Sequence, residues 1–231
     1  MLLSHYELNG PIEFKDGIVN VLVVEKPNYM AKWVGELFGQ LDKKEGSFEL
    51  FDNDAAISIP DNIMLIVNPF SANVNERDVL NKLYAAMKKD ALGEDLYLNT
   101  NAFLSEIESN IRIFIERQPF LLESDTPDIS GLFKLLGIRF AASDSLLEKI
   151  CDYVDICSEF LKIKLFVCVN LKSFLDESEI IRFYSHINYH KKNILMIENV
   201  QRVVTKNEII RIIDNDLCEI PVLEYKGNDI Y

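Results

Sequence analysis

Apolar residues change their spacing along this chain of 231 residues, and the changes predict where helices and strands lie. Residues 18–24 (IVNVLVV) and 63–67 (IMLIV) are nearly unbroken apolar runs, typical of strands covered on both faces of a sheet. Between them, residues 29–38 have a helical period, and residues 48–59 predict two short strands. The first part of the chain therefore predicts an α/β segment.

From about residue 75 the apolar residues follow a helical period up to residue 161. Three apolar stripes predict three long helices, at 79–87, 104–115 and 147–161, and each helix needs a partner to cover its stripe. Asp128 is placed to cap a short helix that stops at Gly137. This middle part of the chain is predicted to be helical.

Strand character returns at residues 165–169 (LFVCV) and again at residues 194–197. The helix predicted between them begins with Asp176 and Glu179 at the spacing of a capping box. A strand, a helix and a strand at this spacing form a βαβ unit, which implies a parallel sheet with a right-handed crossover.

The predicted fold class is α/β, with a parallel-sheet head into which an α-helical leg is inserted. The head is expected to comprise residues 1–70 and 161–231, and the leg residues 71–160. The two ends of the chain would then meet in one sheet.

The charge of the chain restricts its partners. It carries 24 Lys and Arg against 37 Asp and Glu, a formal net charge of −13 that repels a polyanion such as DNA. The acidic excess lies before residue 161, because residues 161–231 carry equal numbers of both signs. Any contact with DNA would therefore need a local basic strip, or a divalent cation beside acidic groups.

The sequence also restricts the compartment. It has no stretch of eighteen uncharged apolar residues, and its start (MLLSHYELNG) lacks the features of a signal peptide. We expect a soluble cytoplasmic protein with no membrane contact. The four cysteines form no CxxC pair, and three of them, Cys151, Cys157 and Cys168, lie in apolar patterns typical of buried free thiols.

A nucleotide site would require a glycine-rich loop after the first long strand, whose backbone N–H groups bind phosphate. Residues 25–29 (EKPNY) contain no glycine, and Pro27 removes one of the backbone donors. No Gly-x-Ser-x-Gly elbow occurs either, and the chain has three histidines. We expect no nucleotide cofactor and no catalytic activity.

Two sets of residues are candidates for binding a metal ion. His186 and His190 are four residues apart on a predicted helix, but no third ligand is evident, which favours exposed helix histidines. The carboxylates Glu123, Asp125 and Asp128 lie in an acidic, proline-containing segment, and such oxygen ligands suit calcium. On spacing alone, a solvated loop with a helix-capping aspartate explains these carboxylates more simply.

Several segments, taken in order, resemble a known family. Residues 7–24 (ELNGPIEFKDGIVNVLVV), 63–83 (IMLIVNPFSANVNERDVLNKL) and 132–149 (LFKLLGIRFAASDSLLEK) are similar to the opening, the head-to-leg junction and the leg of the Csn-two family of CRISPR-associated proteins. Residues 164–169 and 194–198 match its later strands. The resemblance rests on the order and spacing of these segments, and no single motif among them is catalytic.

The resemblance implies a head similar to a degenerate P-loop domain of the ABC ATPase type. It also implies a homotetrameric ring that holds the ends of double-stranded DNA, with calcium ions ordering the legs. Such a protein would have no nuclease or ATPase activity. It would act in antiviral defence, during spacer acquisition, beside the adaptation integrase and the type II effector nuclease.

The resemblance also assigns residues. Basic positions of the family correspond here to Lys82, Lys134, Arg139, Lys149 and Lys162, which would contact DNA phosphates irrespective of sequence. Acidic positions of its calcium-rich segment correspond to Glu123 and Asp125, with Asp128 nearby. Just upstream the chain has the apolar Phe120 and Leu121 where the family has acidic residues.

Two other functions are compatible with the sequence. One is a nucleotide hydrolase or phosphotransferase with an atypical phosphate loop at residues 25–29. The other is an acidic scaffold that binds only proteins, which the net charge favours.

Overall fold

The computed structural model describes residues 1–224, and the chain divides into two compact units. The first, called the sheet unit below, comprises Met1–Asn73 and the chain from Ala142 onward. The second, called the helical unit, is Val74–Ala141. Residues 142–160, which the sequence analysis assigned to the leg, are grouped with the sheet unit by their contacts.

The sheet unit contains all the strands of the described chain. In chain order its elements are β1 (Leu2–Ser4), β2 (Ile12–Glu13), β3 (Val19–Val24), α1 (Pro27–Leu41), β4 (Glu49–Asp52), β5 (Ala55–Ile57), α2 (Ile59–Asn62), β6 (Ile63–Ile66), the 3-10 turn η1 (Pro69–Ser71), α6 (Leu146–Ile156), the π-helical turn η2 (Cys157–Leu161), β7 (Leu165–Val169), the 3-10 turn η3 (Leu171–Ser173), α7 (Glu177–Tyr189), β8 (Asn193–Glu198), β9 (Glu208–Ile213) and β10 (Glu219–Glu224). The helical unit contains α3 (Arg77–Ala91), α4 (Tyr97–Glu116) and α5 (Ile129–Leu135).

A six-stranded sheet in the order β10-β9-β3-β8-β7-β6 organises the sheet unit. The five strands from β9 to β6 are parallel, and β10 pairs antiparallel with β9 at the edge. Val21 in β3 is paired with Met196 in β8 and with Ile210 in β9. The prediction of a mixed α/β fold with a mostly parallel sheet is confirmed, and strands from both ends of the chain share this sheet.

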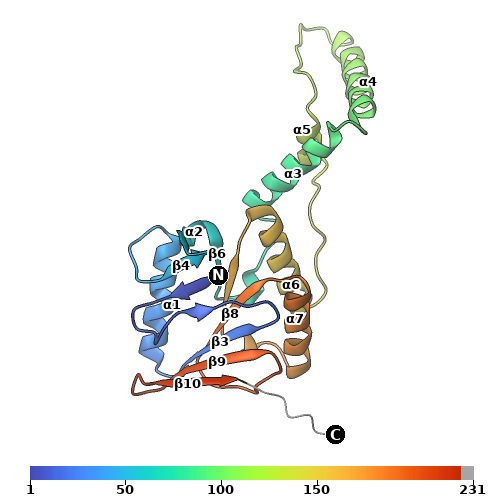
Figure 1. The fold of residues 1–231 in the computed structure, drawn as a ribbon. Helices are drawn as coiled ribbons and strands as arrows, with labels where there is room; N and C mark the ends of the chain where they lie inside the picture. Colours follow the sequence, from blue (N-terminus) through green and yellow to red (C-terminus); the bar gives the residue numbers. More distant parts are fainter. Residues whose placement is uncertain (225–231) are drawn as a thin grey trace. The chain divides into compact units, whose positions relative to one another are not determined.

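Helices cover both faces of this sheet, which explains its apolar strands. In Figure 1, α1 lies on one side of the sheet and α6 and α7 lie on the other. All residues of β3 and β7 are buried, as expected for strands covered on both faces. On the α1 side, Trp33 and Leu37 are fully buried and belong to one core cluster with Leu22 and Val167.

The first residues of the chain form a separate antiparallel sheet in the order β2-β1-β4-β5. This small sheet joins the core on the α1 side, because Leu3 and Leu50 belong to the same cluster as Trp33. The Trp33 indole N–H donates a hydrogen bond to a Glu7 carboxylate oxygen at 2.7 Å. The indole N–H thereby has a hydrogen-bond partner within the core.

Local signals in the sequence set the ends of the helices. The side chain of Asp176 accepts a hydrogen bond from the Glu179 backbone N–H, and Glu179 reciprocates, so the predicted capping box of α7 is present. Asp128 caps α5 by accepting from the Gly131 backbone N–H at 3.1 Å, and Gly137, with φ of +63°, follows the end of that helix. The third predicted helix is present to residue 161, as the α-helix α6 to Ile156 and then as the π-helical turn η2.

The helical unit is held together mainly by contacts between α3 and α5. The Tyr84 hydroxyl on α3 donates to the Ile138 carbonyl oxygen at 2.8 Å. The Asn75 side chain donates to the Phe140 carbonyl at 3.1 Å and accepts from the Phe140 N–H at 2.9 Å. Residues 138–140 are thereby fixed against the start and middle of α3. Among the helices of the described residues, none is long and apolar enough to span a membrane.

Candidate functional site

Ligands of parallel α/β sheets bind in the crevice beyond the carboxyl ends of the strands. The corner between β3 and α1 would carry a phosphate loop, but two residues, Glu25 and Lys26, span it here. Pro27 is the first residue of α1, and Lys26 precedes it in an extended conformation without capping the helix through its side chain. As expected from the sequence, this corner has no glycine-rich loop to surround a phosphate.

A cavity of about 330 Å³ lies at this end of the sheet. Its lining comes from the β3–α1 corner, from α1 and from the ends of β7 and β8: Glu25, Pro27, Met30, Ala31, Val34, Val169, Asn170 and Asn199. The only ionisable group in this lining is the Glu25 carboxylate, which repels phosphate. At the start of α1, the backbone N–H groups of Tyr29 and Met30 donate to the Lys26 carbonyl oxygen, so they are not free to bind a phosphate.

A second polar site lies between η3, the end of β8 and the start of β9. The Lys172 ammonium group forms an ion pair with a Glu208 carboxylate oxygen at 2.5 Å, and both side chains are almost completely buried. Glu208 also accepts hydrogen bonds from the Thr205 hydroxyl at 2.8 Å and from the Thr205 N–H at 3.2 Å. The Lys172 backbone N–H donates to a carboxylate oxygen of Glu198, the last residue of β8, at 3.0 Å.

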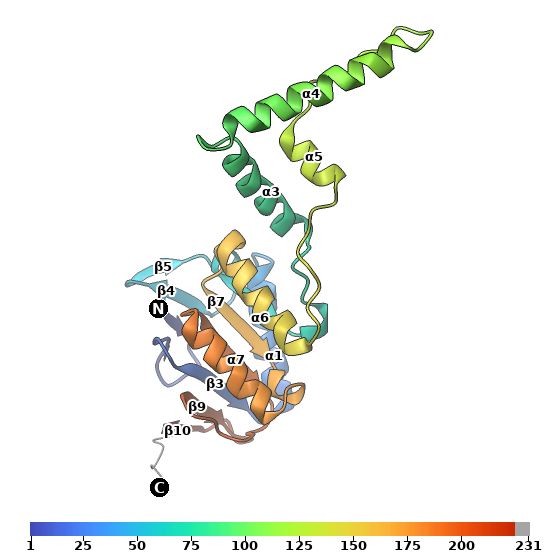
Figure 2. The ribbon, with the colours of Figure 1, turned by 90° about the vertical axis from the view of Figure 1, so that its right-hand side faces the viewer.

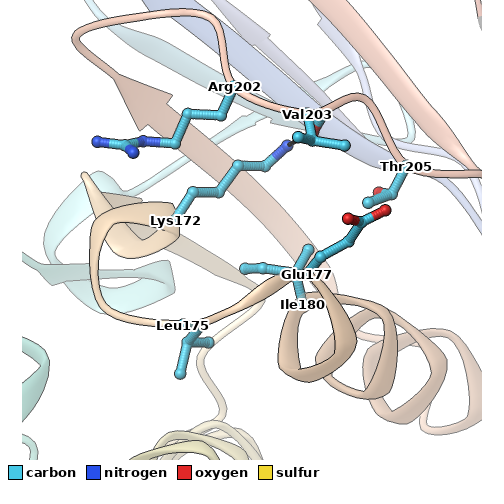
Figure 3. A pocket seen from close by; sticks show the side chains of 7 residues that line it. All are labelled: Lys172, Leu175, Glu177, Ile180, Arg202, Val203 and Thr205. Atoms are coloured by element: carbon cyan, nitrogen blue, oxygen red, sulfur yellow. Dashed lines mark hydrogen bonds between the residues drawn. The ribbon is translucent and has the colours of Figure 1, made fainter.

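Figure 3 shows Lys172 extended toward Val203, beside Arg202 and Thr205. The lysine ammonium group also donates to the Val203 carbonyl oxygen at 3.4 Å. The adjoining cavity, lined by Leu175, Glu177 and Ile180 among others, is about 180 Å³, which is small for a cofactor or nucleotide. Because the lysine is fully engaged within the protein, we interpret this network as a structural bond between the 199–207 segment and the sheet.

Two side chains in and beside this network, Glu198 and Tyr184, have raised pKa values. Burial raises the pKa of the Glu198 carboxyl above its usual value, although hydrogen bonding and attraction from Lys172 and attraction from Arg202 oppose the rise. One oxygen of Glu198 is buried without a hydrogen bond among the described residues, and the Arg202 Nε lies 3.8 Å from it. Burial and the neighbouring Glu208 carboxylate raise the pKa of Tyr184 well above its usual value. Neither Glu198 nor Tyr184 was identified from the sequence as a candidate site residue.

The five basic residues assigned to DNA fall in both units. Lys82 on α3, Lys134 on α5 and Arg139 beyond α5 are exposed on the helical unit. The hydrogen bonds to Ile138 and Phe140 fix the backbone at Arg139 against α3.

The other two assigned cations belong to the sheet unit. The Lys149 ammonium group on α6 donates a hydrogen bond to the Phe70 carbonyl oxygen. Lys162 follows η2 in a left-handed conformation with φ of +62°, and its exposed side chain lies 3.4 Å from Glu159. Lys149 is therefore less available for a phosphate than the exposed cations of the helical unit.

The three carboxylates assigned to calcium lie on the segment between α4 and α5. Glu123 and Asp125 are exposed in irregular backbone. Both oxygens of Asp128 are engaged: one accepts from the Lys88 ammonium group at 2.7 Å and the other from the Gly131 N–H. The hydrogen bond from Lys88 lowers the pKa of Asp128. Over residues 1–224 these three carboxylates do not converge on one point as a set of ligands.

The cysteines match the sequence-based prediction. Cys151, Cys157 and Cys168 are buried free thiols, whereas Cys218 is exposed. Burial raises the pKa of Cys151 and of Cys168 to about 12. These two thiols are therefore protonated at neutral pH and are poor nucleophiles.

One group of side chains in the described part of the chain has ligand atoms close enough to share a metal ion: Asp155, His186 and His190. The sequence analysis considered the two histidines and found no third ligand. Asp155, which lies on α6 and precedes His186 by thirty-one positions in the chain, supplies this third ligand. The sequence signal was the pair of histidines alone, because only the packing of α6 beside α7 brings Asp155 to them.

Comparison with known proteins relates this chain to one protein family. The family model described as CRISPR-associated protein (Cas_Csn2) matches residues 40–217. A protein named "CRISPR-associated protein Csn2" from Enterococcus faecalis is 23% identical over 212 residues, which cover 90% of this chain and 93% of that protein. One of the same name from Streptococcus agalactiae is 23% identical over 180 residues, which cover 77% of this chain and 80% of that protein. Since the family match spans more than half of the chain, this protein belongs to the Cas_Csn2 family of CRISPR-associated proteins.

Proposed function

We propose that this chain is a non-catalytic, ring-forming protein that binds the ends of double-stranded DNA during CRISPR spacer acquisition. The observation that carries the proposal is the family match over residues 40–217, since the resemblance to this family implies that function. The adaptation integrase and the type II effector nuclease are its proposed partners. The structure contributes physical support for three parts of this proposal.

The first part is the absence of catalysis in a head of degenerate P-loop type. In support, β3 lies inside the parallel sheet and leads directly into α1, as the strand and helix of a P-loop do. The corner between them contains no glycine, and the lining of the nearby cavity includes the Glu25 carboxylate and no cation. An α/β head of this kind would act as a scaffold and not as a nucleotide hydrolase.

The second part is self-assembly. In the helical unit, only Val79, Tyr84 and Ile129 are apolar side chains buried within the described chain. Helix α4 buries none of its residues, and the exposed apolar side chains Phe103, Ile111 and Phe114 lie on one side of it. Exposed apolar surface of this extent on one helix is typical of a protein interface. Other copies of the chain, in the proposed tetramer, would cover it.

The third part is the contact with DNA. Lys82, Lys134 and Arg139 are exposed cations on one compact unit, and such side chains bind phosphates without regard to sequence, as binding to DNA ends requires. Lys149 and Lys162 are further candidates from the sheet unit. Because the formal net charge is −13, binding would depend on these local cations and would weaken steeply with salt.

Whether calcium affects DNA binding is to be measured. Glu123, Asp125 and Asp128 do not form a ready-made ligand set in this chain, and Asp128 is occupied by Lys88 and by its capping role.

A mobility shift on matched linear and circular duplex DNA tests the proposal. The protein's mass in solution is determined first, and the shift is measured with calcium and with chelator at two salt concentrations. We expect a tetramer that binds linear but not circular duplex, more weakly at the higher salt. Absence of binding to both forms would contradict DNA binding and favour the acidic scaffold that binds only proteins. A thermal shift with ATP and magnesium completes the test, and stabilisation by ATP would contradict the non-catalytic head.

A further inference from the structure

Three side chains converge where α6 and α7 lie side by side (Figure 2). Asp155 comes from α6, His186 from α7, and His190 is the residue that caps the end of α7. The His186 Nε2 lies 2.9 Å from an Asp155 carboxylate oxygen, and the His190 Nε2 lies 3.9 Å from the same oxygen. The two imidazole rings are tilted by 33° relative to each other, with centroids 4.4 Å apart.

The backbone that carries these residues is held by the core. On α6, Ile150 and Val154 are fully buried against the sheet side of the helix, and on α7 Phe183 and Ile187 are equally buried. Since His186 and His190 are four residues apart on one helix, their rings project to the same side. The three side chains are therefore presented by two fixed helices and not by a loop.

The geometry suits a single small cation. In a tetrahedral zinc site, bonds of about 2.0–2.2 Å place ligand atoms about 3.3–3.5 Å from each other. The separations of 2.9 and 3.9 Å lie on either side of this range, and all three ligand atoms lie within 4.8 Å of one another. Rotamer adjustments of less than about 1.5 Å would bring the three atoms to bonding distance.

The chemistry of the donors selects the class of ion. Two imidazoles and one carboxylate suit zinc and related transition-metal ions, whereas calcium and magnesium prefer oxygen ligands alone. The second oxygen of Asp155 is buried and has no hydrogen bond among residues 1–224, so it is free to contribute to the coordination of an ion. The neighbouring lysines are directed elsewhere: Lys192 donates to the Ser158 hydroxyl at 2.8 Å, and Lys191 lies 3.8 Å from Asp16.

We propose that Asp155, His186 and His190 form a binding site for a zinc-type transition-metal ion. The exposure of His190, whose side chain is 40% accessible, leaves room for a water molecule as the fourth ligand. An ion bound there would link α6 to α7 and stabilise the sheet unit. The proposal does not depend on DNA binding, because all three ligands belong to the sheet unit.

Titration of the full chain with zinc tests the site directly. Tag-free protein is treated with a chelator, dialysed and titrated with zinc chloride in a calorimeter, and a parallel titration with cobalt(II) is followed by its visible absorption. We expect one ion per chain, the intense cobalt spectrum of a four-coordinate site, and a rise of several degrees in the unfolding temperature with excess zinc.

Three variants separate this site from other zinc ligands on the surface. His190→Ala removes an exposed ligand and leaves the core untouched, and Asp155→Asn keeps the shape of its side chain. We expect each to weaken zinc binding by about tenfold or more and to abolish the thermal shift. Glu148→Gln, which changes an exposed carboxylate on the same helix, should leave both unchanged. No stoichiometric binding to the wild-type chain, or binding that survives His190→Ala combined with Asp155→Asn, would overturn the proposal.

Discussion

The two units of this chain differ in how far they bury their own apolar side chains. In the sheet unit, strands such as β3 and β7 are buried along their whole length, and both faces of the sheet are covered by helices of the same chain. In the helical unit, α4 has the apolar period of an amphipathic helix and buries none of its residues. The sheet unit thus completes its core within one chain, whereas the helical unit leaves the large apolar side chains of α4 exposed.

This contrast leads to a clear expectation for substitutions. Changes in the sheet unit should mainly alter the free energy of unfolding, because its interactions are internal. Changes on the helical unit should mainly alter the proposed assembly and DNA binding, because few of its side chains are buried within the described chain. The predictions that follow test this division, beginning with the largest expected effect.

Lys172→Met should give the largest loss of stability. It leaves the Glu208 carboxylate buried without its cation, and breaking such a buried pair costs about 3–5 kcal/mol in the free energy of unfolding. Urea denaturation at neutral pH measures this loss. The double variant Lys172→Met with Glu208→Gln should recover part of the stability, because no unpaired charge remains. A loss of less than about 1 kcal/mol for the single variant would show that the pair is not needed to hold the 199–207 segment.

Ile111→Glu combined with Phe114→Glu should disrupt assembly while leaving the sheet unit stable. Both side chains are exposed on α4, so the fold of one chain loses little, with an expected change in unfolding free energy within about 0.5 kcal/mol. Placed in an interface, the two carboxylates would weaken association by about a hundredfold or more, because unpaired charges are desolvated there. Sedimentation across a concentration series measures the mass.

A matched control for that experiment is Ser105→Glu combined with Ser109→Glu. It adds the same charge at exposed positions on the opposite side of α4 from the stripe that contains Ile111 and Phe114. We expect this control to assemble as the wild-type chain does. Dissociation by both double variants would point to a general effect of charge, and dissociation by neither would contradict the role of α4 in assembly.

Lys134→Glu combined with Arg139→Glu should weaken binding to linear duplex DNA by about tenfold or more and leave the assembled mass unchanged. Each lost phosphate contact should also reduce the slope of log affinity against log salt by about one. The charge-matched control is Lys43→Glu with Lys44→Glu, two exposed cations of the sheet unit. If the two double variants bound linear duplex DNA with equal affinity, the proposed role of Lys134 and Arg139 in DNA binding would be contradicted.

Much of the sheet unit could be predicted from the sequence, because its signals are local. Unbroken apolar runs gave β3, β7 and β8, and capping residues located the starts of α5 and α7. These features depend on neighbours within a few residues, where periodicity and capping chemistry operate. The third long helix was placed correctly to residue 161, but the apolar period did not reveal that its last turn, η2, is π-helical and not α-helical.

The polar sites could not be predicted, because they depend on packing between distant segments. Lys172 and Glu208 are separated by thirty-six positions and have no motif in common. Asp155 lies on the same helix as an apolar stripe, and only the packing of α6 against α7 makes it a neighbour of His186. Residues assigned through resemblance, such as Lys134 and Glu123, are placed by the structure on the helical unit, and their roles remain predictions.

The smallest expected effect concerns two carboxylates of the sheet unit whose pKa values move in opposite directions. Glu7 is partly buried, which opposes ionisation, but hydrogen bonds from Lys32, Trp33 and Tyr29 prevail and lower its pKa from 4.5 to about 2. Burial raises the pKa of Glu198 above 4.5. Glu7 therefore contributes stability that is present above about pH 4.5 and is lost as the pH falls toward about 2. Ionised Glu198 instead lowers stability as the pH rises through the interval above 4.5.

Two neutral variants separate these contributions. Glu7→Gln should lower the free energy of unfolding at neutral pH by about 1 kcal/mol, because the charge-assisted bonds to Lys32 and Trp33 at 2.7 Å are weakened, and the difference from wild type should vanish near pH 2. Glu198→Gln should remove the decrease in stability above pH 4.5. Urea denaturation from pH 2.5 to pH 8 measures both, with the exposed Glu49→Gln as control. If the Glu7→Gln profile ran parallel to that of the wild type over this range, the hydrogen bonds of Glu7 would not stabilise the sheet unit. Internal polar contacts would then contribute less to the difference between the two units.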